Sequence, residues 1–342
     1  MNKKLLATAV AASLAVPVAA NAAEVYGRVN NALSMFDSDA PGADTVWDQR
    51  NVSSRFGLKG SSDLDNGMTV GGRYEFSTFT DREGNTDGRG GVNDTRLGWV
   101  ELSGDFGSVK IGNQWSAFFN AVGTYMSPTF SLGYYLGSSI GTKPLRTSNT
   151  IKYSNSVGPV SFAIDARISS DGAGGDLEKN ISRDRGEDID GIGIGVSFAV
   201  NDSLTIGLAV DSDFYDIDPD TGLNRDDDDR IAVGASYAWG DHHVDVAWYS
   251  IDEGVKSGVQ GRDEDTASIY YHGTWGMNKL MVGYLIADDG PNAEPSQLTL
   301  NFYHKMGGGF QTYVESAWVD ADNGPTFGND FNHIILGMRY DF

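Results

Sequence analysis

The clearest structural pattern in the chain is its last stretch, NHIILGMRYDF at residues 332–342. Every second side chain from Ile334 onward is large and apolar, whereas the positions between them include Gly337, Arg339 and Asp341. Successive side chains of a strand point to opposite faces, so a period of two predicts a strand with one apolar and one polar face. The apolar face of such a strand covers a soluble core or meets lipid.

Segments of the same kind recur along the chain and predict sixteen strands. The gaps between them are alternately short, with Gly, Asn and Asp as in hairpin turns, and long and polar. An even strand number with short turns at one end and long loops at the other is typical of a bacterial outer-membrane β-barrel. The predicted strands are residues 24–36, 53–61, 68–79, 94–103, 107–115, 149–155, 160–169, 190–200, 204–213, 230–239, 243–251, 266–275, 279–287, 297–306, 310–320 and 332–342.

The size of this sheet favours lipid over a soluble core. Sixteen paired strands enclose a space that side chains cannot fill, so the interior is aqueous and the apolar face points outward. Hydrocarbon offers no water to an open sheet edge, so the sheet must close. Beyond the N-terminal region, no apolar run reaches the ~18 residues of a transmembrane helix. The sequence therefore predicts an all-β fold, a 16-stranded antiparallel transmembrane β-barrel.

The N-terminal residues have the form of a secretory signal. Two lysines precede an apolar run over residues 5–20, and the triplet Ala20-Asn21-Ala22 follows. We predict a cleaved signal peptide over residues 1–22 and one barrel domain over residues 23–342. The chain has no cysteine, and its formal net charge of −22 argues against nucleic acid as a partner, because binding it needs concentrated Lys and Arg.

Aromatic residues near the strand ends predict girdles at the two membrane interfaces. A soluble β-protein would bury them instead. The predicted girdle residues are Tyr26, Trp115, Trp239, Trp248, Trp275, Trp318, Tyr340 and Phe342.

Several short stretches match a known family in order and spacing. They are EVYGR at 24–28, SRFGLKG at 54–60, TRLGWV at 95–100, DFGSV at 105–109, NTIKY at 149–153 and RYDF at 339–342. With them the sequence resembles the general bacterial porins of Gram-negative outer membranes, which are trimeric sixteen-stranded diffusion channels. The resemblance implies passive diffusion of ions and small hydrophilic solutes, with no catalytic residue and no cofactor.

The resemblance also implies specific residues and partners. In the family the third loop, here residues 116–148, folds into the barrel and faces an arc of basic residues. The arc carries over to Arg28, Arg55 and Arg96, and less directly to Arg146. Phe342 resembles the family's signal for the barrel-assembly machinery, and a homotrimer in contact with outer-membrane lipid and lipopolysaccharide is implied. The period of two adds Lys59 and Arg73 to the polar faces of their strands.

The loop at residues 116–148 is unusual in its own right. Compact domains seldom contain so long an irregular connection unless it is functional or disordered, and its Phe and Tyr content argues against disorder. It contains no Asp or Glu, whereas Lys143 and Arg146 are basic. We therefore predict a constriction with a local preference for anions, because no acid on this loop would balance the arginines.

The outer loops have the opposite charge. Acidic residues gather between residues 213 and 229 and between residues 252 and 265. They predict a negative vestibule that concentrates cations and is bridged by divalent ions to lipopolysaccharide. The spacing of Asp216, Asp218, Asp220 and Gly222 is similar to a calcium loop, but the glycine is one place late and no glutamate stands at position twelve.

Two other classes of protein fit the sequence less well than a channel does. Residues 137–141 fit G-x-S-x-G, but they lie in the irregular loop, whereas a nucleophile elbow needs a strand before it and a helix after it. The five histidines have no metal-binding spacing, and His242 and His243 are expected to face solvent. The alternative function is an outer-membrane or secreted β-rich adhesin or binding protein. Glu101 is expected on the outward face, where a protein contact would shield its charge from lipid.

Overall fold

The computed structural model describes residues 21–81, 92–126, 145–168, 189–214, 228–253, 263–288, 293–322 and 328–342. Within these ranges the chain forms a single antiparallel sheet and two short helical turns, the π-helix η1 (Phe119–Gly123) and α2 (Thr124–Met126). Neither of these described helical segments has the length and apolar content that crossing a bilayer requires. The strands are β1 (Asn21–Ser38), β2 (Val46–Asn51), β3 (Arg55–Asp63), β4 (Thr69–Thr78), β5 (Val92–Gly104), β6 (Gly107–Trp115), β7 (Arg146–Val157), β8 (Val160–Ile168), β9 (Ile189–Ala199), β10 (Leu204–Asp213), β11 (Asp228–Trp239), β12 (His242–Glu253), β13 (Asp263–Trp275), β14 (Asn278–Ala287), β15 (Ser296–Gly307), β16 (Phe310–Asp320) and β17 (Phe331–Asp341).

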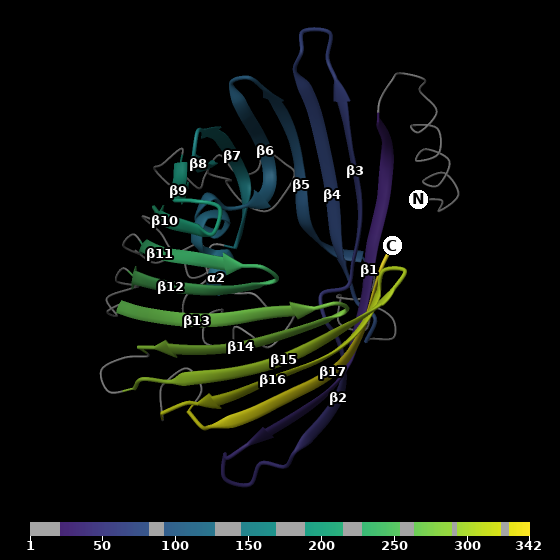
Figure 1. Cartoon of the computed structure of the whole chain (residues 1–342), viewed down its shortest axis with the longest axis vertical. Helices are drawn as coiled ribbons and strands as arrows, with labels where there is room; N and C mark the ends of the chain where they lie inside the picture. Colours follow the sequence, from purple (N-terminus) through teal and green to yellow (C-terminus); the bar gives the residue numbers. More distant parts are fainter. Residues whose placement is uncertain are drawn as a thin grey trace, which may run out of the picture.

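The sheet closes on itself because the first strand pairs with the last. One edge of β1 pairs with β17 over residues 28–38, and the other edge pairs with β3 and β2. Figure 1 shows the strands following one another around the ring, with β1 beside β17. Since β2 and β3 pair with successive parts of β1, they share one place in the ring. The seventeen strands therefore make the closed 16-stranded barrel that the sequence predicted.

A short break at residues 52–54 separates β2 from β3. Ser53 has a positive φ of 58°, and the Ser54 hydroxyl accepts a hydrogen bond from the N–H of Asn30 at 2.9 Å. The Val52 side chain joins an apolar cluster on the inner wall with Tyr313 and other residues of β1 and β15–β17. The sequence predicted a loop over residues 37–52, and this is wrong for the part that forms β2.

Burial alternates along the strands as a barrel in lipid requires. In β17, Leu336 and Met338 are 57% and 60% exposed, whereas Ile335, which precedes Leu336, is fully buried. The same alternation places Leu208 and Val210 of β10 on the outer wall. The apolar outer face predicted from residues 332–342 is confirmed.

A β-bulge in β5 overturns the prediction for Glu101. Phe76 pairs with Thr95 while the adjacent Glu75 pairs with Leu97, so Arg96 is an extra residue that shifts the alternation by one place. Residues 97, 99 and 101 consequently face inward, and Glu101 forms an ion pair with Lys110 at 3.4 Å. The inference of a shielded outward charge at this position is wrong.

Six of the eight predicted girdle residues lie on the outer wall of the barrel. Exposed outward side chains are Trp239, Trp248, Trp275, Trp318, Tyr340 and Phe342. Tyr26 instead points inward, where its hydroxyl donates to Glu75 at 3.0 Å. Trp115 stacks on Phe119 with ring centroids 4.7 Å apart, so it packs against the loop rather than against lipid.

Candidate functional site

Residues 116–126, which follow β6, lie inside the barrel. η1 contacts β9, β10 and β11, and α2 contacts β11, β12 and β13. Phe118, Val122 and Met126 are fully buried, in one cluster with alanines of the wall and Tyr249. Figure 1 shows α2 within the ring of strands. The rest of the predicted inward loop, residues 127–144 with Lys143, lies outside the described residues.

Three glycines on adjacent strands let this segment approach the wall closely. A Cβ atom at Gly195 on β9 would overlap the carbonyl oxygen of Ala117, and one at Gly207 on β10 would overlap that of Ala121. On β11, a Cβ at Gly234 would lie 2.6 Å from the Tyr125 ring. Only glycine leaves room for a backbone at this distance. We call these three residues the glycine bed.

A buried charge cluster holds the start of the segment. The backbone N–H of Ala117 donates to Asp165 on β8 at 2.5 Å. Arg167, two residues further along β8, donates to both carboxylate oxygens of Asp211 on β10, at 2.7 and 3.1 Å. These three charged side chains are at most 10% exposed, so they support the segment from behind rather than facing the water.

The second arginine of the cluster, Arg230 on β11, extends it to the strand ends. Its nearest oxygens belong to Asp213 at 2.6 Å, Asp211 at 3.1 Å and Asp228 at 3.5 Å. The sequence predicts Asp213 and Asp228 in the outer vestibule, but the structure places both in this inner cluster. Four carboxylates face two guanidinium groups, which leaves a formal charge of −2.

Arg146 lies at the other end of the loop, beside its entry. Its guanidinium carbon is 5.3 Å from the centroid of the Trp115 ring, and the same ring stacks on Phe119 in η1. Lys152 on β7 donates to the carbonyl oxygen of Trp115 at 2.6 Å. The two ends of the loop are thus held together by cation–π and hydrogen-bond contacts to one tryptophan.

Three of the predicted arginines meet at a single carboxylate. Glu75 on β4 lies 2.7 Å from Arg73, 3.0 Å from Arg96 on β5 and 3.5 Å from Arg55 on β3. The side chain of Glu75 is 1% exposed, whereas those of the arginines are 15% to 30% exposed on the inner face. The bulge at Arg96 lets the Arg96 side chain point inward beside Leu97, where it can reach Glu75.

The remaining predicted basic residues lie on both sides of this group. Arg28 on β1 pairs with Asp341 of β17 at 2.7 Å, and Arg339 binds the other oxygen of the same carboxylate. Lys59 pairs with Glu24 at 3.1 Å and is about half exposed. We call the five arginines at 28, 55, 73, 96 and 339 the basic strip.

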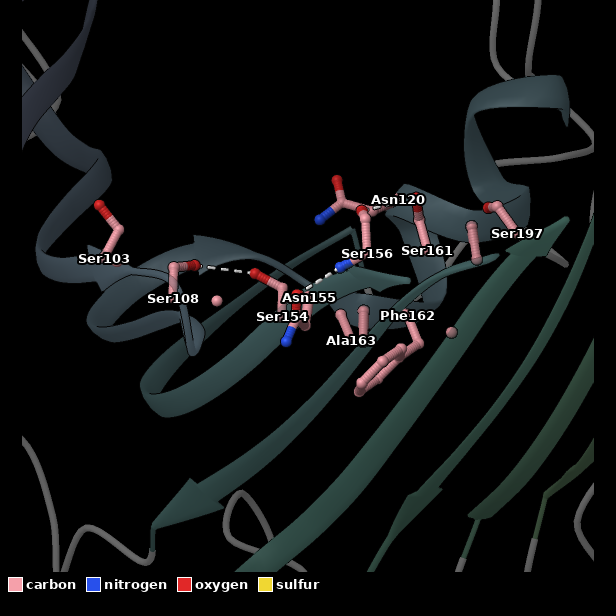
Figure 2. A pocket seen from close by; sticks show the side chains of 15 residues that line it. Ser103, Ser108, Asn120, Ser154, Asn155, Ser156, Ser161, Phe162, Ala163 and Ser197 are labelled. Atoms are coloured by element: carbon pink, nitrogen blue, oxygen red, sulfur yellow. Dashed lines mark hydrogen bonds between the residues drawn. The ribbon is translucent and has the colours of Figure 1, made fainter. Parts of the chain in front are cut away.

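A polar recess lies between η1 and the wall formed by β5–β9. It has a volume of about 490 Å³, and Figure 2 shows how Asn120 and the serines of neighbouring strands border it. Ser108 on β6 and Ser154 on β7 share a hydrogen bond of 2.9 Å within it. Hydroxyl and amide groups suit a wall in contact with water and small polar solutes.

Comparison with known proteins identifies the family. A family model described as Gram-negative porin matches residues 7–324. The chain belongs to this porin family. This porin is an outer-membrane β-barrel that forms a channel, and its family membership agrees with the expectation that it is not an enzyme. The G-x-S-x-G stretch at residues 137–141 lies outside the described residues, as do the calcium-like spacing at 216–222 and most of the outer loops.

Relatives with known names are also outer-membrane proteins. The porin is 25% identical to Outer membrane protein S2 of Salmonella typhi over 327 aligned residues. The alignment covers 88% of this chain and 76% of that protein. Its structure resembles that of an anion-selective porin from Comamonas acidovorans, with a TM-score of 0.75 and 21% sequence identity. The superposition covers 94% of this chain and 99% of that one. It also resembles the trimer form of OmpT from Vibrio cholerae, with a TM-score of 0.64, 17% identity, and coverage of 94% and 99%.

The prediction that His242 and His243 simply face solvent is incomplete for this porin, because both are partly exposed and both also contact neighbouring rings. The His242 ring shares a hydrogen bond of 2.9 Å with the Tyr271 hydroxyl and stacks on Trp239 in the outer girdle. The His243 ring stacks on His272 inside the barrel. The sequence missed both contacts because each pairs residues on different strands.

Proposed function

We propose that this porin passes ions and small hydrophilic solutes by passive diffusion, and that residues 116–148 narrow its water-filled barrel opposite the basic strip. The observation that carries the proposal is the position of residues 116–126 on the glycine bed, inside the ring. A segment fixed on the inner wall removes part of the cross-section from the water path. Figure 1 shows that β9–β11, which hold the segment, lie across the ring from β1 and β3.

The charge of the basic strip supports a local preference for anions. Its five arginines are accompanied by two carboxylates, Glu75 and Asp341, which leaves an excess of three positive charges. Residues 116–148 contain no Asp or Glu that could balance them. Charges in a narrow, partly low-dielectric passage act more strongly on an ion than they do in bulk water. Lys59, Lys143 and Arg146 belong to the same proposal as further basic positions.

Reversal potentials of single channels in a salt gradient test this proposal. We expect the wild-type channel to favour anions, and Arg96→Gln to lower the anion-to-cation permeability ratio, because it removes a charge from the strip. The matched control is Lys305→Gln, which removes an exposed charge beside the short turn after β15. Cation selectivity that persists after the acids of the outer loops are neutralised would overturn the proposal.

We also propose that the porin forms a homotrimer in contact with outer-membrane lipid and lipopolysaccharide, and that Phe342 directs it to the barrel-assembly machinery. The family and the trimer form of the Vibrio cholerae relative support the trimer. Glu101 gives it no support, because its side chain faces inward. Molar-mass measurement of the protein in detergent by light scattering would find a monomer if the trimer is wrong.

A further inference from the structure

Three inward-facing side chains, those of His243, Asp245 and His272, lie close together on β12 and β13, two of the strands that α2 contacts. His243 and His272 are direct register partners, and their rings stack with centroids 4.2 Å apart. The Nε2 atom of each ring faces the same oxygen of Asp245, at 3.6 Å from His243 and 3.4 Å from His272. One donor atom from each residue lies within 4.8 Å of the other two.

The polar atoms of this group are buried without the usual partners. His272 is 2% exposed, and neither of its ring nitrogens has a hydrogen-bond partner among the residues that the structure describes. Oδ1 of Asp245, a residue that is 5% exposed, likewise has none within the described ranges. Buried polar groups are nearly always satisfied, so an exception calls for a cause such as a bound ion. The His243 side chain is 38% exposed and leaves an approach from the water-filled interior.

We propose that His243, Asp245 and His272 bind one divalent transition-metal ion of the Zn²⁺ type. Two imidazoles and a carboxylate are common zinc ligands, with bonds of about 2.0–2.2 Å. A tetrahedron with such bonds has donor-to-donor edges of about 3.3–3.6 Å, and the two Asp245–His distances, 3.6 and 3.4 Å, fall in this range. The lone pair of an imidazole nitrogen lies in the plane of its ring, so two rings stacked within 9° of parallel cannot both aim at one ion. The partly exposed His243 ring must therefore rotate out of the stack when the ion binds, and water takes the fourth position.

The donor set also determines which ions fit. Imidazole nitrogens favour zinc, copper and nickel, whereas magnesium and calcium prefer oxygen ligands. The site is therefore distinct in kind from the bridging of divalent ions by acidic outer loops. Lys279 lies on β14 two residues from Met281, the register partner of His272, and therefore on the same face of the sheet. The ammonium group of Lys279 opposes a bound cation, so we expect moderate affinity.

Zinc binding to the untagged, purified protein tests the proposal. Isothermal titration with ZnCl₂, in buffer that contains millimolar Mg²⁺, should show one Zn²⁺ per chain. The variants His243→Gln and His272→Asn should bind at least about tenfold more weakly, as is usual when a metal site loses a ligand or its support. His242→Gln is the matched control, because this neighbouring histidine points to the opposite face of the same strand and should leave zinc binding unchanged.

Two results would overturn the proposal. One is the absence of zinc uptake by the wild-type protein, and the other is equal zinc affinity in wild type and His243→Gln. His243→Gln is the deciding variant, because a half-exposed side chain can be replaced without the risk to folding that the buried His272 carries. Crystals grown with zinc should show an anomalous difference peak at the zinc edge between His243 and His272, and a peak elsewhere would also count against this site.

Discussion

Glu75 is the residue on which the basic strip depends. Its buried carboxylate lies within 3.5 Å of three guanidinium groups from three strands, and it also accepts from the Tyr26 hydroxyl. Guanidinium groups this close repel one another, so the carboxylate is what allows them to share one part of the wall. The residue thus stabilises a group of positive charges that would otherwise be forced apart.

We expect Glu75→Gln to destabilise the folded barrel by about 3–5 kcal/mol, because it removes one partner of a buried ion network. It should also raise the anion-to-cation permeability ratio of any channel that still folds, since one negative charge is lost. Denaturant unfolding in detergent measures the first effect and reversal potentials measure the second.

The control is Glu101→Gln, which breaks the more exposed pair with Lys110 at 3.4 Å. It should cost less than about 1 kcal/mol. Equal unfolding midpoints for the two variants would show that Glu75 has no special role.

At the scale of elements, the inner wall of β8–β11 is complementary in shape and in hydrogen bonding to the loop segment that rests on it. The glycine bed removes side chains from three adjacent strands at the place where residues 117, 121 and 125 rest, and Asp165 fixes the first backbone N–H of the segment. Strand interiors gain little from glycine, which has no side chain to pack and loses more entropy on folding. These glycines are therefore explained by the loop rather than by the sheet.

Gly207→Ala tests this relation between loop and wall. Its Cβ atom would overlap the carbonyl oxygen of Ala121, a backbone atom that cannot rotate away, so the segment should lift from the wall and change the single-channel conductance. Gly72→Ala on β4 is the control, because its Cβ would have no heavy atom nearer than 3.7 Å. Identical conductance in Gly207→Ala and wild type would contradict a role for the glycine bed in placing the loop.

At the scale of the whole molecule, the ring is joined at the two ends of the chain. Gly27 and Phe342 exchange backbone hydrogen bonds of 2.9 and 3.1 Å, and Arg28 pairs with Asp341 beside them. The Phe342 ring lies directly over Gly27, where a Cβ atom would overlap it. Phe342 therefore helps to close the barrel by backbone and side-chain contacts together.

Deletion of Phe342 should reduce the yield of folded barrel on refolding into detergent, measured by the mobility shift of unheated samples on gels. It removes both closing hydrogen bonds and the ring over Gly27. Phe302→Ala is the comparison, because Phe302 is similarly exposed on the outer wall, at 45% against 55%, but lies within β15. Equal yields for the two variants would show that the contacts between Gly27 and Phe342 make no particular contribution to folding of the barrel.

The sequence predicted the strands well because their burial follows a simple period of two. Boundaries for β10, β16 and β17 agree with the prediction within about a residue. The period fails where an irregularity shifts it, as at Arg96, where one extra residue turned Glu101 from outward to inward. The position of a bulge cannot be recognised from the alternation of one strand, because it is defined by the register with the neighbouring strand.

The contacts within the candidate site were harder to predict from the sequence than the strands. The resemblance pointed to Arg28, Arg55 and Arg96, but it did not show that Glu75 joins Arg55 to Arg96. The Asp165 cluster and the histidine pair were missed, because each brings together residues from different strands whose spacing in the sequence is irregular. Such contacts depend on strand register, which local patterns determine only for hairpin neighbours.

The pairing of β1 with β17 makes closure of the barrel depend on two strands that lie far apart in the sequence. A polypeptide that lacks β17 would leave the edge of β1 over residues 28–38 unpaired. In hydrocarbon that edge would keep bare amides and carbonyls, which exacts a large free-energy penalty. Closure of the sheet is therefore possible only after β17 is present to pair with β1, although fifteen other strands separate the two in the sequence.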